Sequence, residues 1–240
     1  MYRGPFYSRC YTQATDSKKH DNGSRYMDFR EAFEKTLQEF SDGLYLPEIE
    51  KAKYEFFAAS GVIHEDNSNF LERINLFLDW YVFDRKLDND DLTPLKFFCE
   101  KHGASFTQEE KDFLEGMNNF ISSVFFVKSV NKERVKVKDL FTGQVYKVSD
   151  NYVINLVNKG DVFQGRLIPL NDKNIFSRGF CFHPQETIGY IKSEIKKIKN
   201  MGHVYHTAFM ARLALMKLKT EEYAHVPVGH IYCEKPKIRF

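Results

Sequence analysis

The spacing of hydrophobic residues changes twice along the chain. Up to about residue 122, apolar residues recur every three or four positions, as in helices that bury one face. From residue 124 to 182 the apolar positions instead fall in short runs, the clearest of which alternates with a period of two and is typical of half-buried strands. The helical spacing returns after Pro184. We therefore predict an α+β fold, in which an N-terminal helical bundle precedes a small antiparallel β-sheet or barrel and two C-terminal helices.

Five helices are expected in the N-terminal half. Asn69 and Glu72 resemble a capping pair at the start of the third helix, which has the most apolar stripe and should be central. Pro94 opens the fourth helix at its first turn. Residues 107–110 read Thr-Gln-Glu-Glu and form a capping box for the fifth.

Five strands are expected in the following stretch. Residues 134–138 alternate strictly between basic and apolar side chains, and the turn at residues 141–144 joins them to a strand at residues 145–148. The remaining strands are expected at residues 152–157, 162–170 and 175–182, and the tail around residues 230–233 should be extended.

These elements suggest a division of the chain into four parts. Residues 1–24 are polar and are expected to form a flexible arm. The helical domain spans residues 25–122, the small β-sheet or barrel spans residues 123–183, and the C-terminal helices and extended tail span residues 184–240.

Charge is distributed unevenly between the two halves. Residues 28–121 carry 21 acidic and 10 basic residues, whereas residues 122–240 carry 20 basic and 10 acidic ones. Such asymmetry suggests an anionic partner for the basic half. The alternative is that the two halves attract each other, within one molecule or across a homo-oligomer.

Several classes of protein and of site are not indicated. No apolar run has the roughly 20 residues of a membrane helix. The four cysteines are far apart, which favours free thiols and a cytoplasmic location without membrane contact. The phosphate-binding patterns GxxxxGK[ST] and GxGxxG do not occur, nor do the catalytic patterns GxSxG and HExxH. We therefore predict no cofactor, and the sequence favours a binding protein over an enzyme.

Residues 159–167 place glycine at both ends of a strand and a basic residue just after it. This segment is similar to one in small nucleic-acid-binding barrels of the OB type, where glycines let a strand bend sharply. The resemblance implies that lysine and arginine neutralise phosphates while exposed tyrosines stack on bases. Tyrosines on short strands are otherwise core residues. The predicted nucleic-acid-binding residues are Arg134, Lys136, Lys138, Tyr146, Lys147, Tyr152, Arg166, Lys192, Lys196 and Lys199.

We therefore expect a non-enzymatic binding or regulatory protein whose basic C-terminal half contacts an anionic macromolecule. Nucleic acid is the first candidate for the partner, and an acidic protein surface is the second. A metal-dependent enzyme that uses His203, His206 and His230 is the alternative, because three or four such ligands can hold a transition metal. A scaffold with its acidic and basic halves in mutual contact is the third possibility.

Residues 80–85 read Trp-Tyr-Val-Phe-Asp-Arg and are the most distinctive local sequence. Residues 70–87 resemble a helix in uncharacterised bacterial proteins that carry a Cys-rich SEC-C zinc motif. That motif is missing from this chain, so the resemblance implies neither a metal nor an activity. Asp84 and Arg85 can serve as an acid–base pair, although such pairs are usually structural.

Overall fold

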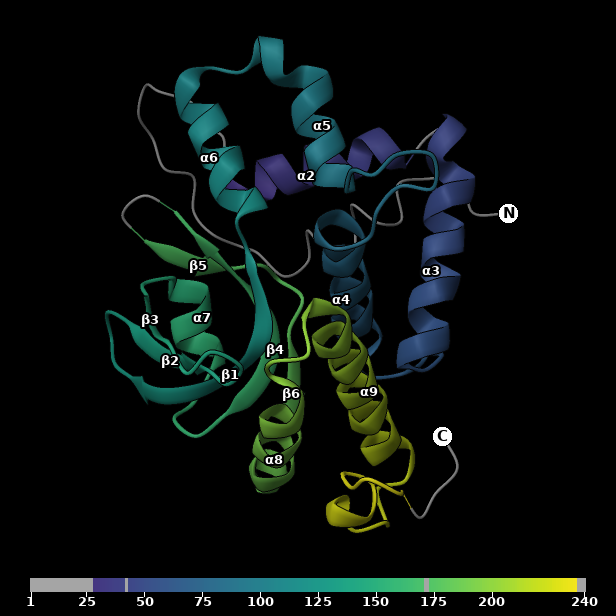
Figure 1. Ribbon diagram of the computed structural model, residues 1–240, viewed down its shortest axis with the longest axis vertical. Coiled ribbons are helices and arrows are strands. Elements are labelled where there is room, and N and C mark those ends of the chain that lie inside the picture. Colours follow the sequence, from purple (N-terminus) through teal and green to yellow (C-terminus); the bar gives the residue numbers. More distant parts are fainter. Residues whose placement is uncertain (1–27, 42, 171–172, 237–240) are drawn as a thin grey trace.

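The computed structural model describes residues 28–41, 43–170 and 173–236. A helical part, a β-barrel beside it and two C-terminal helices follow one another along the chain (Figure 1). The predicted α+β class is confirmed. The predicted arm at residues 1–24 lies outside the described residues, and the division into four domains stays a prediction.

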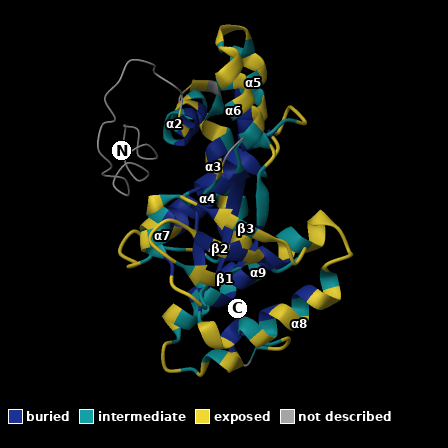
Figure 2. Ribbon diagram, turned by 90° about the vertical axis from the view of Figure 1, so that its left-hand side faces the viewer, coloured by how far each residue is buried: buried dark blue, intermediate teal, exposed yellow. Residues whose placement is uncertain are grey.

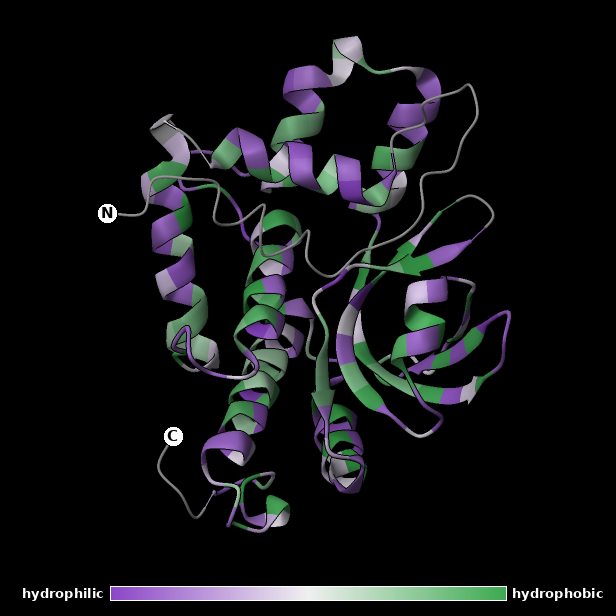
Figure 3. Cartoon of the chain, turned by 180° about the vertical axis from the view of Figure 1, so that it is seen from behind, coloured by the Kyte–Doolittle hydropathy of each residue, from purple (hydrophilic) through white to green (hydrophobic). Residues whose placement is uncertain are grey.

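The helical part is built around α4 (Phe70–Phe83), as its apolar stripe predicted. Ile74, Phe77, Leu78 and Tyr81 of this helix are fully buried. Figure 3 shows α4 between α3 and the barrel, with hydrophobic residues on much of its surface. The surrounding helices are α2 (Phe29–Phe40), α3 (Leu46–Ser60), α5 (Pro94–His102) and α6 (Gln108–Asn118).

The helix starts predicted at Pro94 and Thr107 are confirmed, whereas the capping pair predicted at the start of α4 is wrong. Thr107 and Glu110 form the predicted capping box, in which each side chain accepts a hydrogen bond from the other residue's backbone N–H. Asn69 makes no such bond at the start of α4. Its side-chain amide donates instead to Glu221 of α9 (His203–Glu222), so a contact between distant segments replaces the expected pair with Glu72.

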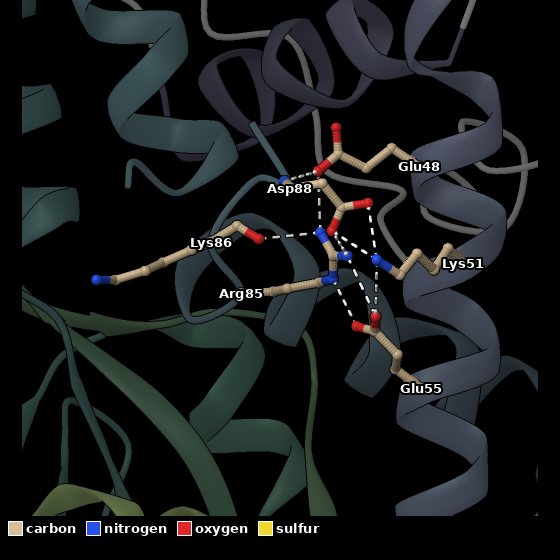
Figure 4. A network of polar contacts seen from close by, with 6 residues as sticks. All are labelled: Glu48, Lys51, Glu55, Arg85, Lys86 and Asp88. Carbon is tan, nitrogen blue, oxygen red and sulfur yellow. Dashed lines mark hydrogen bonds and ion pairs between the residues drawn. The ribbon is translucent and has the colours of Figure 1, made fainter. Parts of the chain in front are cut away.

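Arg85 joins the end of α4 to α3 (Figure 4). Its Nε donates to Glu55 at 2.8 Å, Nη1 to Glu48 at 3.0 Å and Nη2 to Asp88 at 2.8 Å. Burial alone would lower the pKa of Arg85, but the three carboxylates outweigh it and hold that pKa above its usual range. The guanidinium is therefore a fixed cross-link between the two helices, rather than one member of an acid–base pair with Asp84.

The long strand β1 (Ile121–Val130) closes the barrel. Its first half pairs with β4 and its second half with β2, so the ring order is β1-β2-β3-β5-β4-β1. All neighbours in the ring are antiparallel except β3 and β5. The ring is thus a closed barrel of five strands, with a helix between β3 and β4 along the chain. The other strands are β2 (Val135–Asp139), β3 (Val145–Val148), β4 (Val162–Pro169), β5 (Asn174–Phe176) and β6 (Cys181–His183), which pairs with β4 outside the ring.

The prediction of a strand at residues 152–157 is wrong, because these residues belong to helix α7 (Asn151–Leu156). The carboxylate of Asp150 accepts a hydrogen bond from the backbone N–H of Tyr152 at 2.9 Å and starts the helix. Val153 is fully buried in the barrel core. Packing into the barrel therefore overrides the strand preference of these β-branched residues.

Helices α8 (Ile188–Ile198) and α9 (His203–Glu222) cover the outside of the sheet. Ile191 and Ile195 of α8 join the same hydrophobic cluster as Val124 of β1 and Val162 of β4. Helix α9 also packs against α3, so it touches both parts of the molecule. The prediction of an extended tail around residues 230–233 is wrong. Residues 228–230 form a 3₁₀ turn after α9 instead.

The predicted strand at residues 175–182 is interrupted, since β5 and β6 are separate and Gly179 lies between them. The backbone N–H of Gly179 donates to Oδ2 of the buried Asp79 at 2.8 Å. A Cβ at this position would lie 2.5 Å from that oxygen and 2.9 Å from the backbone oxygen of Asn75. Only glycine lets the chain approach α4 so closely.

We expect Gly179→Ala to lower the free energy of unfolding by about 1–3 kcal/mol, because the new methyl group overpacks a site that is bounded by backbone. Gly189→Ala is the matched control, since a Cβ there meets nothing within 4 Å, and it should be neutral or stabilising by up to about 1 kcal/mol. Urea unfolding of both variants measures the difference. Equal stabilities would show that the close approach is not a constraint.

Candidate functional site

The strands β2 and β3 present lysines on the outer face of the barrel. Lys136 lies directly opposite Lys147 in the register of the two strands. Lys138 follows on the same face, and all three side chains are exposed while the alternate residues of β2 are buried. In Figure 2 the barrel with β1, β2 and β3 lies on the side that faces the viewer. The strictly alternating sequence thus produces the row of charges that it predicted.

Helix α8 continues this face. The Nζ atom of Lys192 lies 5.2 Å from the ring centre of Phe126, and Phe126 is the strand partner of Lys138. Lys196 and Lys199 are also exposed, and Ile191 and Ile195 of the same helix pack against Val124 of β1. The lysines of the helix and those of the strands therefore belong to one surface.

This basic surface consists of Arg134, Lys136, Lys138, Lys147, Lys192, Lys196 and Lys199. Among the described residues, no carboxylate lies within ion-pair distance of any of the seven, whereas the neighbouring Lys197 pairs with Glu194 at 2.6 Å. In the described part of the chain, ion pairs between the acidic and basic halves involve Arg166. The acidic helices thus leave the charges of the basic surface uncompensated.

Three of the predicted residues lie elsewhere. Tyr146 is the strand partner of the buried Val137 and packs against the barrel core, so it faces away from Lys136. Tyr152 lies on α7, where the guanidinium of Arg178 sits 3.9 Å from its ring centre. The basic surface therefore lacks the two tyrosines. Phe126, which was not among the predicted residues, is an aromatic residue beside its lysines.

Arg166 is buried rather than part of the basic surface. Its side chain is 7% exposed, and Nε donates to Oδ2 of Asp84 at 2.7 Å. Its Nη1 lies 3.8 Å from Oδ2 of Asp79, which is completely buried. Arg166 comes from β4 and both aspartates come from α4 or its end, so this cluster joins the barrel to the helical part.

The histidines proposed as metal ligands are engaged separately. The ring of His206 stacks on Phe141 with centres 4.2 Å apart. His203 lies beside the hydroxyl of Thr207, and His230 is exposed in the 3₁₀ turn after α9. Within the described ranges, no group of three or more His, Cys, Asp or Glu side chains is arranged to hold a metal ion.

Comparison with known protein families assigns the chain to one family. A model of the family of unknown function DUF7986 matches residues 20–217, and the chain belongs to that family. The match includes the residues that resemble SEC-C proteins, but it shows no link to them. No curated protein and no solved structure matches the chain. None of the helices described here has both the length and the apolar character needed to cross a bilayer.

The buried carboxyl of Asp79 predicts an unusual pH dependence. Burial raises its pKa from 3.8 to about 6, although Arg166 acts against that shift. Between these two pH values the folded protein binds more protons than the unfolded chain, so the free energy of unfolding falls as the pH rises. The shift corresponds to about 3 kcal/mol.

We expect the stability of the wild type relative to Asp79→Asn to fall by about 2 kcal/mol between pH 4 and 7, because the asparagine stays uncharged. Urea unfolding at a series of pH values measures this. Asp88→Asn is the matched control. Lys51 and Arg85 lower the pKa of the Asp88 carboxyl, so this group titrates below the range from pH 4 to 7. Parallel curves for wild type and Asp79→Asn would contradict the prediction.

Proposed function

We propose that this protein binds single-stranded nucleic acid through the basic surface. The observation that carries the proposal is the pairing of Lys136 with Lys147 on the exposed face of β2 and β3. In OB-type barrels this face, together with the adjoining loops, binds oligonucleotides and oligosaccharides. Of these two ligands the oligonucleotide carries negative charge, so an uncompensated row of lysines favours it.

The position of the two lysines supports the same conclusion. Like charges directly opposite each other on neighbouring strands destabilise a sheet. No described carboxylate relieves the repulsion between Lys136 and Lys147. A phosphate backbone laid across the strands would relieve it and would release counterions. Lys192 of α8, next to Phe126, extends the row beyond the sheet.

Base stacking is expected to contribute little to the binding free energy. Tyr146 faces the barrel core and Tyr152 is covered by Arg178. Binding is therefore expected to depend mainly on phosphate contacts and to show little sequence preference. An acidic protein is the second candidate partner, because it also carries negative charge, but it does not need the regular spacing of lysines along β2.

We expect a short, fluorescently labelled single-stranded oligonucleotide to bind at about 50 mM salt and to dissociate as salt rises to about 200 mM, because each phosphate contact releases counterions. The double variant Lys136→Glu/Lys147→Glu should bind at least about tenfold more weakly and flatten the slope of log K against log salt by about 1.4, or 0.7 for each lost contact. Fluorescence anisotropy measures both quantities.

Lys96→Glu/Lys111→Glu is the matched control, since both lysines are exposed on the helical part and make the same change in net charge. It should bind like the wild type apart from a small general effect of charge. Absence of binding at about 50 mM salt, or equal losses in the two double variants, would refute the proposal and favour an acidic protein partner.

A further inference from the structure

A second site lies where the helical part meets the barrel. A pocket of about 480 Å³ opens between α3, α4, β4 and α9, within the range of roughly 300–1,000 Å³ that is common for small-molecule sites. It is separate from the basic surface, because none of the seven residues of that surface lines it. Its ligand must therefore be inferred from its own side chains.

Two aromatic rings border the pocket, and α9 contributes three alanines alongside larger residues such as Met210. The rings of Phe56 and Trp80 lie 5.5 Å apart and both border the space. On α9, Ala208, Ala211 and Ala214 line it. Short side chains on α9 leave room for a flat group against the rings, which is the arrangement in which aromatic faces interact favourably.

The polar end of the pocket offers both a donor and an acceptor. Oδ2 of Asp84 is engaged by Arg166, but no described residue donates to its Oδ1. Nη1 of Arg166 lies beyond hydrogen-bond distance from Asp79, at 3.8 Å. The side-chain amide nitrogen of Gln164 donates to the backbone of Met210, and its Oε1 receives no bond from the described residues. These groups border the pocket with hydrogen-bonding capacity left over.

The charges of the lining residues cancel in pairs. Asp84 is matched by Arg166, and Glu55 is matched by Arg85 at 2.8 Å. An anion would meet the carboxylates and a cation would meet the guanidinium groups, so the pocket favours an uncharged ligand. A purely apolar ligand would leave the donor and acceptor of the polar end desolvated and unpaired, at a cost in affinity.

We propose that this pocket binds a nucleobase, as a free nucleoside. A nucleobase is flat, uncharged and aromatic, and carries a donor and an acceptor side by side on one edge. Its face would stack on Trp80 while that edge pairs with Asp84 and Arg166. The proposal does not rest on the binding of a polymer to the basic surface, since the two sites share no residue.

The chain provides its own probe for this site, because Trp80 is its single tryptophan. Adenosine, inosine, cytidine and uridine are titrated separately into the full-length protein, and Trp80 fluorescence is excited at the red edge of its absorption. At least one nucleoside should quench it in a saturable way, with Kd below about 1 mM. Isothermal titration calorimetry on the same samples confirms the affinity.

Two substitutions fill the pocket. Ala211→Phe and Ala208→Phe should each weaken binding of that nucleoside at least tenfold. Ala208 is exposed at the rim of the pocket, so Ala208→Phe is expected to fold even if Ala211→Phe does not. Ala224→Phe is the matched control, since Ala224 is exposed and does not line the pocket. No saturable quenching by any of the four nucleosides, or unchanged affinity in Ala208→Phe, would overturn the proposal.

The same variants separate the two proposals. Lys136→Glu/Lys147→Glu should bind the nucleoside like the wild type, and Ala208→Phe should keep the salt-dependent binding of the oligonucleotide. Loss of nucleoside binding in the lysine variant would place the nucleoside on the basic surface and would overturn the assignment to the pocket.

Discussion

The buried contact of Arg166 with Asp79 of α4 and with Asp84 at its end determines how the two parts of the molecule are held. Burying a guanidinium is costly unless its N–H groups find acceptors, and carboxylates both accept these bonds and compensate the charge. Asp84 accepts its hydrogen bond, and Asp79 adds a second negative group while also accepting from Gly179. The barrel therefore cannot shift along α4 without leaving a buried charge unpaired.

This contact also separates the basic residues of the C-terminal half into two kinds. Arg166 is buried because α4 covers the outer face of β4 at that point. Its charge is compensated by Asp79 and Asp84, where the helical part meets the barrel. The lysines of β2, β3 and α8 lie on a side that no helix of the acidic half covers, and their charges stay available to a partner. The pocket lies along the joint itself, which explains why its polar groups come from the same ion pairs that hold the two parts together.

Local sequence patterns were sufficient to predict part of the basic surface. Alternation along residues 134–138 predicted the outward lysines, and the tight hairpin turn placed Lys147 on the same sheet. The same alternation should have assigned Tyr146 to the core, because it is adjacent to the outward Lys147. Arg166 could not be placed in this way, since the helix that buries it lies far earlier in the chain. The pocket combines four elements that are distant in sequence, so no local motif marks it.

The closing strand β1 has a consequence for the order in which the chain can fold. β1 is paired on one side by the hairpin neighbour β2 and on the other by β4, which arrives only after β3 and α7 have been traversed. Closing a loop of that length costs chain entropy before its contacts form, which makes such steps slow. Arg166 lies on β4, so Asp84 gains its counter-charge only when this strand is in place. We therefore expect the docking of helices and barrel to follow ring closure during refolding.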